Sequence, residues 1–115
     1  MTTEIPYSDF EKLDLKVGKI LEVKDHPNAD KLYILTVDLA EEKPRQILAG
    51  LRPYYKKEEL KNKKAIFITN LEPRKIRGLE SNGMILAADN TKGKVIFLTP
   101  KEDVKEGSKV EFNYG

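Results

Sequence analysis

The chain has 115 residues, 39% of them apolar and 35% charged, which suits a single domain with its own core. It has no cysteine and one histidine, so disulfides, thiol catalysis and zinc sites of cysteine or clustered histidine are excluded. No apolar run approaches the roughly 20 residues of a membrane-spanning helix, and the first residues lack the pattern of a signal peptide. We therefore expect a cytoplasmic protein that does not enter a membrane.

Charge is unevenly distributed along the chain. Residues 43–78 contain 11 bases and 3 acids, a net charge of +8, whereas residues 1–42 and 79–115 have net charges of −5 and −1. Such a block indicates a surface for a polyanion if the fold brings the bases to one face. A solvated surface rich in lysine and glutamate, as in heat-adapted proteins, explains the block equally well.

Short apolar runs predict mostly β-strands. In the first half of the chain we expect strands at residues 15–23, 32–39 and 45–49. Gly18 indicates a bend or bulge in the first of them, and residues 26–30 form a predicted turn. The run 32–39 is apolar on both faces, which is typical of a central strand or a barrel strand.

The second half of the chain continues this pattern. A short helix is expected at 56–63, where glycine and proline are absent. Pro73 and Gly78 enclose a predicted basic loop at residues 74–77. Further strands are expected at residues 64–70, 83–88, 95–98 and 109–112.

Five core strands with a helix between the third and the fourth have the order of the OB-fold, a partly open five-stranded Greek-key barrel. Other small β-barrels fit the spacing nearly as well. We predict an all-β protein with one short helix, forming a single domain over residues 1–115. Its core covers about residues 9–98, and residues 1–8 and 99–115 are extensions.

The titratable residues do not form a recognisable active site. His26 lies in a Pro-Asn turn, where a structural or solvent-facing role is expected. The neighbouring pairs Glu41-Glu42 and Glu58-Glu59 are poorly placed to work together as acid and base. Calcium loops, glycine-rich phosphate loops and dinucleotide motifs are absent from the sequence. We therefore predict no enzyme activity, no metal and no cofactor.

The segment 70–84 is the strongest candidate for ligand binding. Arg74 and Arg77 can each contact phosphate through two nitrogens, and Lys75 adds a point charge. The alternative interpretation is an ordinary charged hairpin loop at the surface.

The end of this segment, Ser81-Asn82-Gly83-Met84, adds neutral groups to the bases. Ser81 and Asn82 can form hydrogen bonds with bases or ribose, and the flexible thioether of Met84 can pack against a base. Met84 could instead be a core residue.

A second cluster combines aromatic and basic residues at 48–57. Tyr54 and Tyr55 next to Arg52 and Lys56 suit stacking and phosphate contact on a nucleic-acid surface. At least one of the two tyrosines could instead pack into the open end of the barrel.

Five sequence blocks occur in order along the chain. They are Asp14 to Ile20 (DLKVGKI), His26 to Leu32 (HPNADKL), Ala49 to Tyr55 (AGLRPYY), Asn70 to Lys75 (NLEPRK) and Ser81 to Met84 (SNGM). Together they closely resemble the tRNA-binding domain appended to many methionyl-tRNA synthetases, which also exists as a stand-alone dimeric protein. The resemblance covers about residues 9–98.

The resemblance implies an OB-fold that binds tRNA by its folded shape, with little regard to sequence. Such a domain is an auxiliary factor or β subunit of methionyl-tRNA synthetase and catalyses nothing itself. The positions that match RNA-facing residues of the family are Lys31, Asn70, Arg74, Lys75, Ser81 and Met84. Charge and position add Arg52 and Arg77. Asn82 stands where the family often has glutamine, and its shorter side chain weakens the case for direct contact.

The resemblance also implies a homodimer, because the flanks of stand-alone relatives build the interface. Apolar contacts could come from Ile5, Tyr7, Val104, Val110, Phe112 and Tyr114. A related branch of the family is a dimeric export chaperone, and its versions of blocks 51–55 and 81–84 differ. A third hypothesis, a generic single-strand binder, is weakened by the absence of tryptophan and by only nine aromatic residues.

Overall fold

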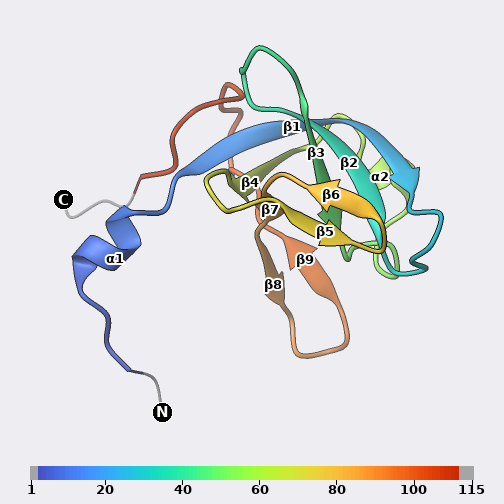
Figure 1. Ribbon diagram of the computed structural model, residues 1–115, viewed down its shortest axis with the longest axis horizontal. Coiled ribbons are helices and arrows are strands. Elements are labelled where there is room, and N and C mark those ends of the chain that lie inside the picture. Colours follow the sequence, from blue (N-terminus) through green and yellow to red (C-terminus); the bar gives the residue numbers. More distant parts are fainter. Residues whose placement is uncertain (1–2, 112–115) are drawn as a thin grey trace.

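The computed structural model describes residues 3–111, which form mainly short antiparallel strands (Figure 1). The main sheet has the order β3-β2-β1-β4-β7 and curves into a nearly closed barrel. Its strands are β1 (Leu15–Asp25), β2 (Tyr33–Asp38), β3 (Arg45–Ala49), β4 (Lys64–Ile68) and β7 (Met84–Ile85). This barrel confirms the predicted all-β, OB-like fold.

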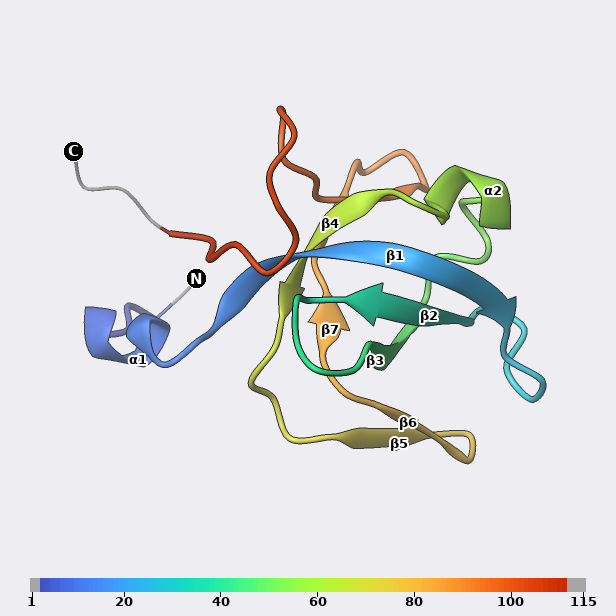
Figure 2. The same cartoon turned by 90° about the horizontal axis from the view of Figure 1, so that it is seen from above.

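The remaining elements extend from the barrel. Two small hairpins pair β5 (Arg74–Ile76) with β6 (Leu79–Ser81) and β8 (Ala87–Asp89) with β9 (Val95–Phe97). The helices are α1 (Tyr7–Glu11) and α2 (Lys57–Leu60). Figure 2 shows α1 at the end of the molecule opposite the tip of the β5–β6 hairpin. No helix in residues 3–111 has the length and hydropathy needed to span a membrane.

The core lies inside the barrel and follows the alternation of the strands. On β2, Tyr33, Leu35 and Val37 are buried while the residues between them are half-buried, as expected for a strand between two others. The largest fully buried side chains include Ile20, Leu35, Ile47, Leu51, Leu60 and Phe67. Leu60 comes from α2, which therefore covers one end of the barrel.

The barrel closes between β3 and the segment β6–β7 through single hydrogen bonds instead of a ladder. The Leu48 N–H donates to Ser81 Oγ (3.0 Å), and the Asn82 N–H donates to the Gln46 carbonyl (2.8 Å). The amide of Gln46 in turn donates to the Glu80 carbonyl (2.8 Å). The position of the segment 80–82 is therefore fixed by side chains as well as by backbone.

Several expected elements differ in the structure. Residues 74–77 were expected as a loop, but the first three form β5 because they pair with β6. The expected strand 83–88 is divided, since β7 pairs with β4 whereas β8 pairs with β9. Within the expected strand 109–112, Lys109 forms an isolated bridge with Lys16, and Phe112 and Tyr114 lie outside the described residues. The short helix α1 was not predicted.

Gly18 is not the bulge that the sequence indicated. The irregularity of β1 falls between Ile20 and Glu22, whereas Gly18 pairs regularly with Ala65 of β4. Gly18 is needed for close packing, because a Cβ there would lie 2.7 Å from Val37 Cγ1 and 2.8 Å from Phe67 Cδ1.

We expect Gly18→Ala to lower the free energy of unfolding by about 1–3 kcal/mol, because the added methyl group overpacks a close-packed core. Urea denaturation measures this change. Gly50→Ala is the matched control, since its Cβ would meet nothing nearer than Leu32 Cδ2 at 3.9 Å. Equal stability of the two variants would show that the core accommodates the methyl group.

Candidate nucleic-acid interface

The β5–β6 hairpin carries three bases of the predicted binding segment. Arg74 lies opposite Ser81 in the register and Lys75 opposite Glu80, so these two bases point to opposite faces of the hairpin. Arg77 and Gly78 form its turn with φ of +50° and +89°, as a type I′ turn requires. All three bases are exposed, and none of them forms an ion pair within residues 3–111.

Arg45 holds both ends of the segment that contains this hairpin. Its Nη1 donates to the carbonyl of Thr69 (2.6 Å), where the chain leaves the barrel, and to that of Asn82 (3.4 Å), where it returns. Nε and Nη2 donate to the two carboxylate oxygens of Glu41, both at 2.7 Å. This two-bond contact orients the guanidinium plane toward the carbonyl groups.

The contact also changes both ionisation equilibria. The hydrogen bond from Arg45 lowers the pKa of Glu41 below its ordinary value, and the hydrogen bond from Glu41 raises the pKa of Arg45. Glu41 contributes stability above its ordinary pKa of 4.5 in the unfolded chain, and this contribution is lost as the pH falls through its lower folded value. The pair is therefore fully ionised at neutral pH.

His26 connects the hairpin to the turn at residues 26–32. Its side chain is buried, with 2% of its surface exposed. Nδ1 accepts a hydrogen bond from the Asn28 N–H (3.0 Å), so the ring proton is on Nε2, which donates to the Ile76 carbonyl (3.1 Å). His26 therefore has a structural role, because its ring joins the turn that carries Lys31 to the hairpin.

The hydroxyl and amide groups of the predicted site are partly occupied inside the protein. Ser81 is buried, and its hydroxyl donates to the Gly83 carbonyl (2.9 Å) while accepting from Leu48. Asn70 donates to the Lys12 carbonyl (2.6 Å) and accepts from the Asp14 N–H (2.8 Å). The structure thus gives both side chains a positioning role, and their contact with RNA stays a prediction.

The other predicted site residues differ in their exposure and in whether their side chains already have a partner within the protein. Met84 on β7 is 45% exposed and is not a core residue. Asn82 is half-buried, and its side-chain amide forms no hydrogen bond with the part of the chain that the structure describes. Lys31 is exposed and forms no ion pair there, whereas Arg52 Nε lies 3.5 Å from Asp25 Oδ1.

The basic block 43–78 does not gather on one face. Figure 2 shows α2 and the β5–β6 hairpin on opposite sides of β1 and β2, so the lysines around α2 are separated from the hairpin bases. Lys64 is bound to the C-terminal segment, donating to Asp103 Oδ1 and to the Val104 carbonyl, both at 2.7 Å. Its hydrogen bond to Asp103 raises the pKa of Lys64. The basic residues of the hairpin therefore form a smaller positive surface than the whole block, and the nearby 26–32 turn adds Lys31 beside Asp30.

Tyr55 confirms that one tyrosine of the second cluster packs against the core. Its ring makes an edge contact with Phe97 (centroids 5.3 Å apart), and Lys94 Nζ lies 4.9 Å from the ring centroid. The Tyr33 hydroxyl donates to the Tyr55 carbonyl (2.7 Å). The Tyr55 ring therefore packs against the barrel instead of standing free to stack on a nucleobase.

The sequence interpretation missed Arg45 and Gln46 and did not identify the partner of His26. Their acceptor carbonyl groups are 24, 34 and 50 residues away in the sequence. No local pattern predicts such pairs. Within the described part of the chain no cluster of three or more His, Asp or Glu side chains is suited to hold a metal ion.

Comparison with known proteins identifies relatives of this chain. The family described as "Putative tRNA binding domain" matches residues 15–109. The methionine–tRNA ligase of Pyrococcus horikoshii is 59% identical over 106 residues, which make up 92% of this chain and 14% of that ligase. The chain therefore spans about one seventh of the length of this curated relative.

Solved structures resemble the chain over almost its whole length. A MetRS-related protein from Pyrococcus horikoshii has a TM-score of 0.87 and 34% identity, with 96% of this chain and 100% of that chain covered. The CsaA chaperone protein from Picrophilus torridus has a TM-score of 0.85 and 35% identity, with 94% and 100% covered.

We expect His26→Ala to release the hairpin, because the Ile76 carbonyl loses its donor. Trypsin should then cleave after Arg74, Lys75 and Arg77 several times faster than in the wild-type protein, since cleavage requires local opening. Cleavage after Lys92, in the β8–β9 turn, serves as the internal reference. His26→Gln should restore part of the protection, because its amide can donate to Ile76. Unchanged cleavage in His26→Ala would show that the hairpin is held without this bond.

Proposed function

Because the chain belongs to the tRNA-binding domain family, we propose that it binds folded tRNA without catalysing a reaction and assists methionyl-tRNA synthetase as an auxiliary factor or β subunit. The observation that carries the proposal is the hairpin with Arg74, Lys75 and Arg77. These bases are exposed, have no acidic partner in residues 3–111, and stand on a segment held at both ends by Arg45.

The mechanism follows from this arrangement. Figures 1 and 2 both place the tip of the hairpin and the 26–32 turn at the same end of the molecule, so Lys31 and Arg77 can contact one phosphate backbone. Phosphate contacts of this kind set affinity and orientation but do not read sequence. His26 and Arg45 hold the backbone that carries these lysine and arginine side chains. An RNA whose phosphates match the spacing of those side chains therefore binds best. Selection is therefore by the shape of the folded RNA.

We expect the double substitution Arg74→Glu and Lys75→Glu to weaken binding of all tRNAs alike. Each lost contact between a cation and phosphate is worth about tenfold in affinity. The slope of log affinity against log salt should become less steep by about two, because two fewer counterions are released. Filter binding or fluorescence anisotropy at several salt concentrations measures both quantities.

Two variants separate charge from folding in this experiment. Lys101→Glu with Lys105→Glu makes the same change of charge on the C-terminal segment, which Figure 2 shows on the other side of the barrel, and should leave affinity nearly unchanged. Arg77→Asn removes one charge but suits the positive φ of the turn, so it should lower affinity without lowering stability. Equal affinity in the original protein and the hairpin double variant would contradict the assignment.

The link to a synthetase is supported by the relatives. The match to one seventh of a methionine–tRNA ligase indicates a module that works beside a catalytic domain. Binding energy from such a module would raise the local concentration of tRNA at the synthetase. This role would place the protein in the cytoplasm, where aminoacylation occurs.

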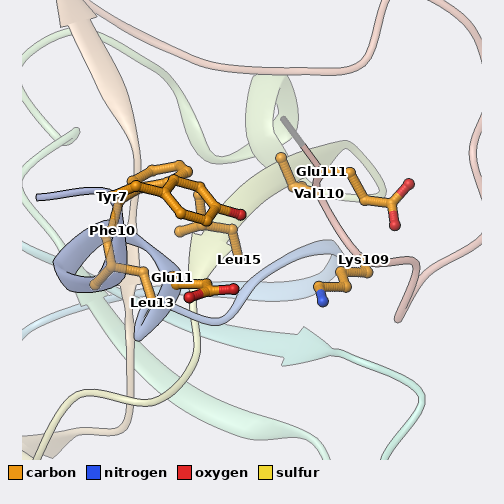
Figure 3. A pocket seen from close by; sticks show the side chains of 8 residues that line it. All are labelled: Tyr7, Phe10, Glu11, Leu13, Leu15, Lys109, Val110 and Glu111. Carbon is orange, nitrogen blue, oxygen red and sulfur yellow. The ribbon is translucent and has the colours of Figure 1, made fainter. Parts of the chain in front are cut away.

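We also propose that the protein is a homodimer. A groove of mixed apolar and charged character between α1 and the segment 109–111 is lined by Tyr7, Phe10, Leu13, Leu15 and Val110, with Glu11, Lys109 and Glu111 (Figure 3). Ile5 and Leu13 are 64% and 39% exposed. Residues 107–110 themselves fold back on β1, with Val110 N–H donating to the Leu15 carbonyl (2.8 Å). A second copy is the occupant that covers these side chains, because the charged wall of the groove can pair with its own symmetry mate.

We expect Leu13→Asp to convert the dimer into a monomer, because a carboxylate would be buried at the interface. Sedimentation equilibrium gives the mass. Ile96→Asp is the control, since Ile96 is 42% exposed on the separate β8–β9 hairpin. A monomeric original protein, or a dimer that Leu13→Asp leaves intact, would contradict the proposal.

A second candidate function is a peptide-binding chaperone on the same scaffold. The similarity to the CsaA chaperone protein of Picrophilus torridus favours it. It requires that suppression of client aggregation survives the Arg74→Glu and Lys75→Glu substitutions. If the protein binds tRNA and does not suppress aggregation, the chaperone function is rejected.

A further inference from the structure

An open groove of about 390 Å³ lies between the β5–β6 hairpin and the barrel. Its apolar lining comes from three parts of the chain, namely Leu48 of β3, Leu71 and Ile76 before and within the hairpin, and Met84 of β7. Leu71 and Met84 are 40% and 45% exposed, so apolar surface is presented to solvent beside the exposed bases.

The shape of the groove is fixed by its polar neighbours. Ser81 lines it, but its hydroxyl is already bonded to Leu48 N–H and the Gly83 carbonyl, so this wall offers little to a polar ligand. Gly83 has φ of +126°, and a Cβ there would lie 3.0 Å from the Ile68 carbonyl oxygen and 3.2 Å from Ile47 Cδ1. The backbone at Gly83 is therefore packed directly against Ile68 and Ile47, with no room for a side chain.

Charged groups at the groove indicate what kind of ligand fits. Arg74 lines it and forms no ion pair within residues 3–111, whereas Lys75 points to the other face of the hairpin. Glu72 also lines it and can accept a hydrogen bond from the N–H edge of a base. A ligand with a flat apolar body, N–H donors and an adjacent negative charge would match the apolar lining, the Glu72 carboxylate and the Arg74 guanidinium, respectively. An uncharged apolar peptide would leave the Arg74 guanidinium without a partner.

We propose that this groove binds one unpaired nucleobase of the folded RNA, with the base against Leu71 and Met84 and its phosphate on Arg74. This inference rests on the proposed function. The polarizable sulfur of Met84 makes favourable contacts with aromatic rings. A base inside a duplex presents only its edge, so the groove requires a nucleotide that is unstacked from its neighbours. The protein therefore distinguishes a folded RNA with loops from a continuous duplex of equal charge.

The test compares folded tRNA with a fully paired RNA duplex of the same number of nucleotides at one salt concentration. The double variant Leu71→Ala and Met84→Ala should lose about tenfold in affinity for tRNA, because apolar contact area is removed. Its affinity for the duplex and its salt slope should stay unchanged, since the charges remain. Leu98→Ala is the matched control, because Leu98 is 41% exposed and lies beyond β9, outside the groove lining.

The outcomes separate this inference from the proposed function. If the original protein binds no RNA, the proposed function fails and the groove inference fails with it. If the original protein binds tRNA and the Leu71→Ala, Met84→Ala variant binds it equally well, only the groove inference is overturned. Equal loss of affinity for tRNA and duplex would also overturn it. If the Leu71→Ala, Met84→Ala variant still binds tRNA but no longer binds an unfolded polypeptide that the wild-type protein binds, the groove is a peptide site and the inference is overturned.

Discussion

Arg45 joins Glu41 to the carbonyl groups of Thr69 and Asn82, the two points where the chain leaves the barrel and returns to it. The rest of the binding face depends on this contact. Between these two held ends the segment forms a short hairpin, whose backbone is thereby tied to the sheet. Order that exists before binding reduces the entropy lost when RNA binds. His26 extends this order to the 26–32 turn through the Ile76 carbonyl.

The barrel itself could be predicted because its strands carry local signals. Residues 32–39 are apolar on both faces and contain β2, the strand between β1 and β3. The β5–β6 hairpin carries no such signal, since Arg74, Lys75 and Glu80 do not alternate with apolar residues. Its strands form because Gln46, His26 and Arg45 bind its carbonyl groups and those at its ends. Tertiary contacts of this kind override local propensity.

The exposure of the charged candidate residues was easier to predict than the surroundings of the neutral ones. Arg74, Lys75 and Arg77 are exposed as expected, because long charged side chains seldom have other places to lie. Ser81 and Asn70 were expected to face RNA, and the structure shows their side chains bonded to backbone groups 33 and 56 residues away. A sequence can show that a hydroxyl or amide is present in a motif. It cannot show which backbone group accepts or supplies the hydrogen bond.

The central claim is that a preorganised basic hairpin selects folded tRNA. A competition assay tests it most directly, with labelled folded tRNA challenged by unlabelled tRNA, unstructured RNA of equal length and single-stranded DNA. It should be run at two salt concentrations, about 50 mM and 200 mM. The account predicts that only folded tRNA competes well and that affinity falls steeply with salt. Equal competition by all three nucleic acids, or no binding at low salt, would contradict it.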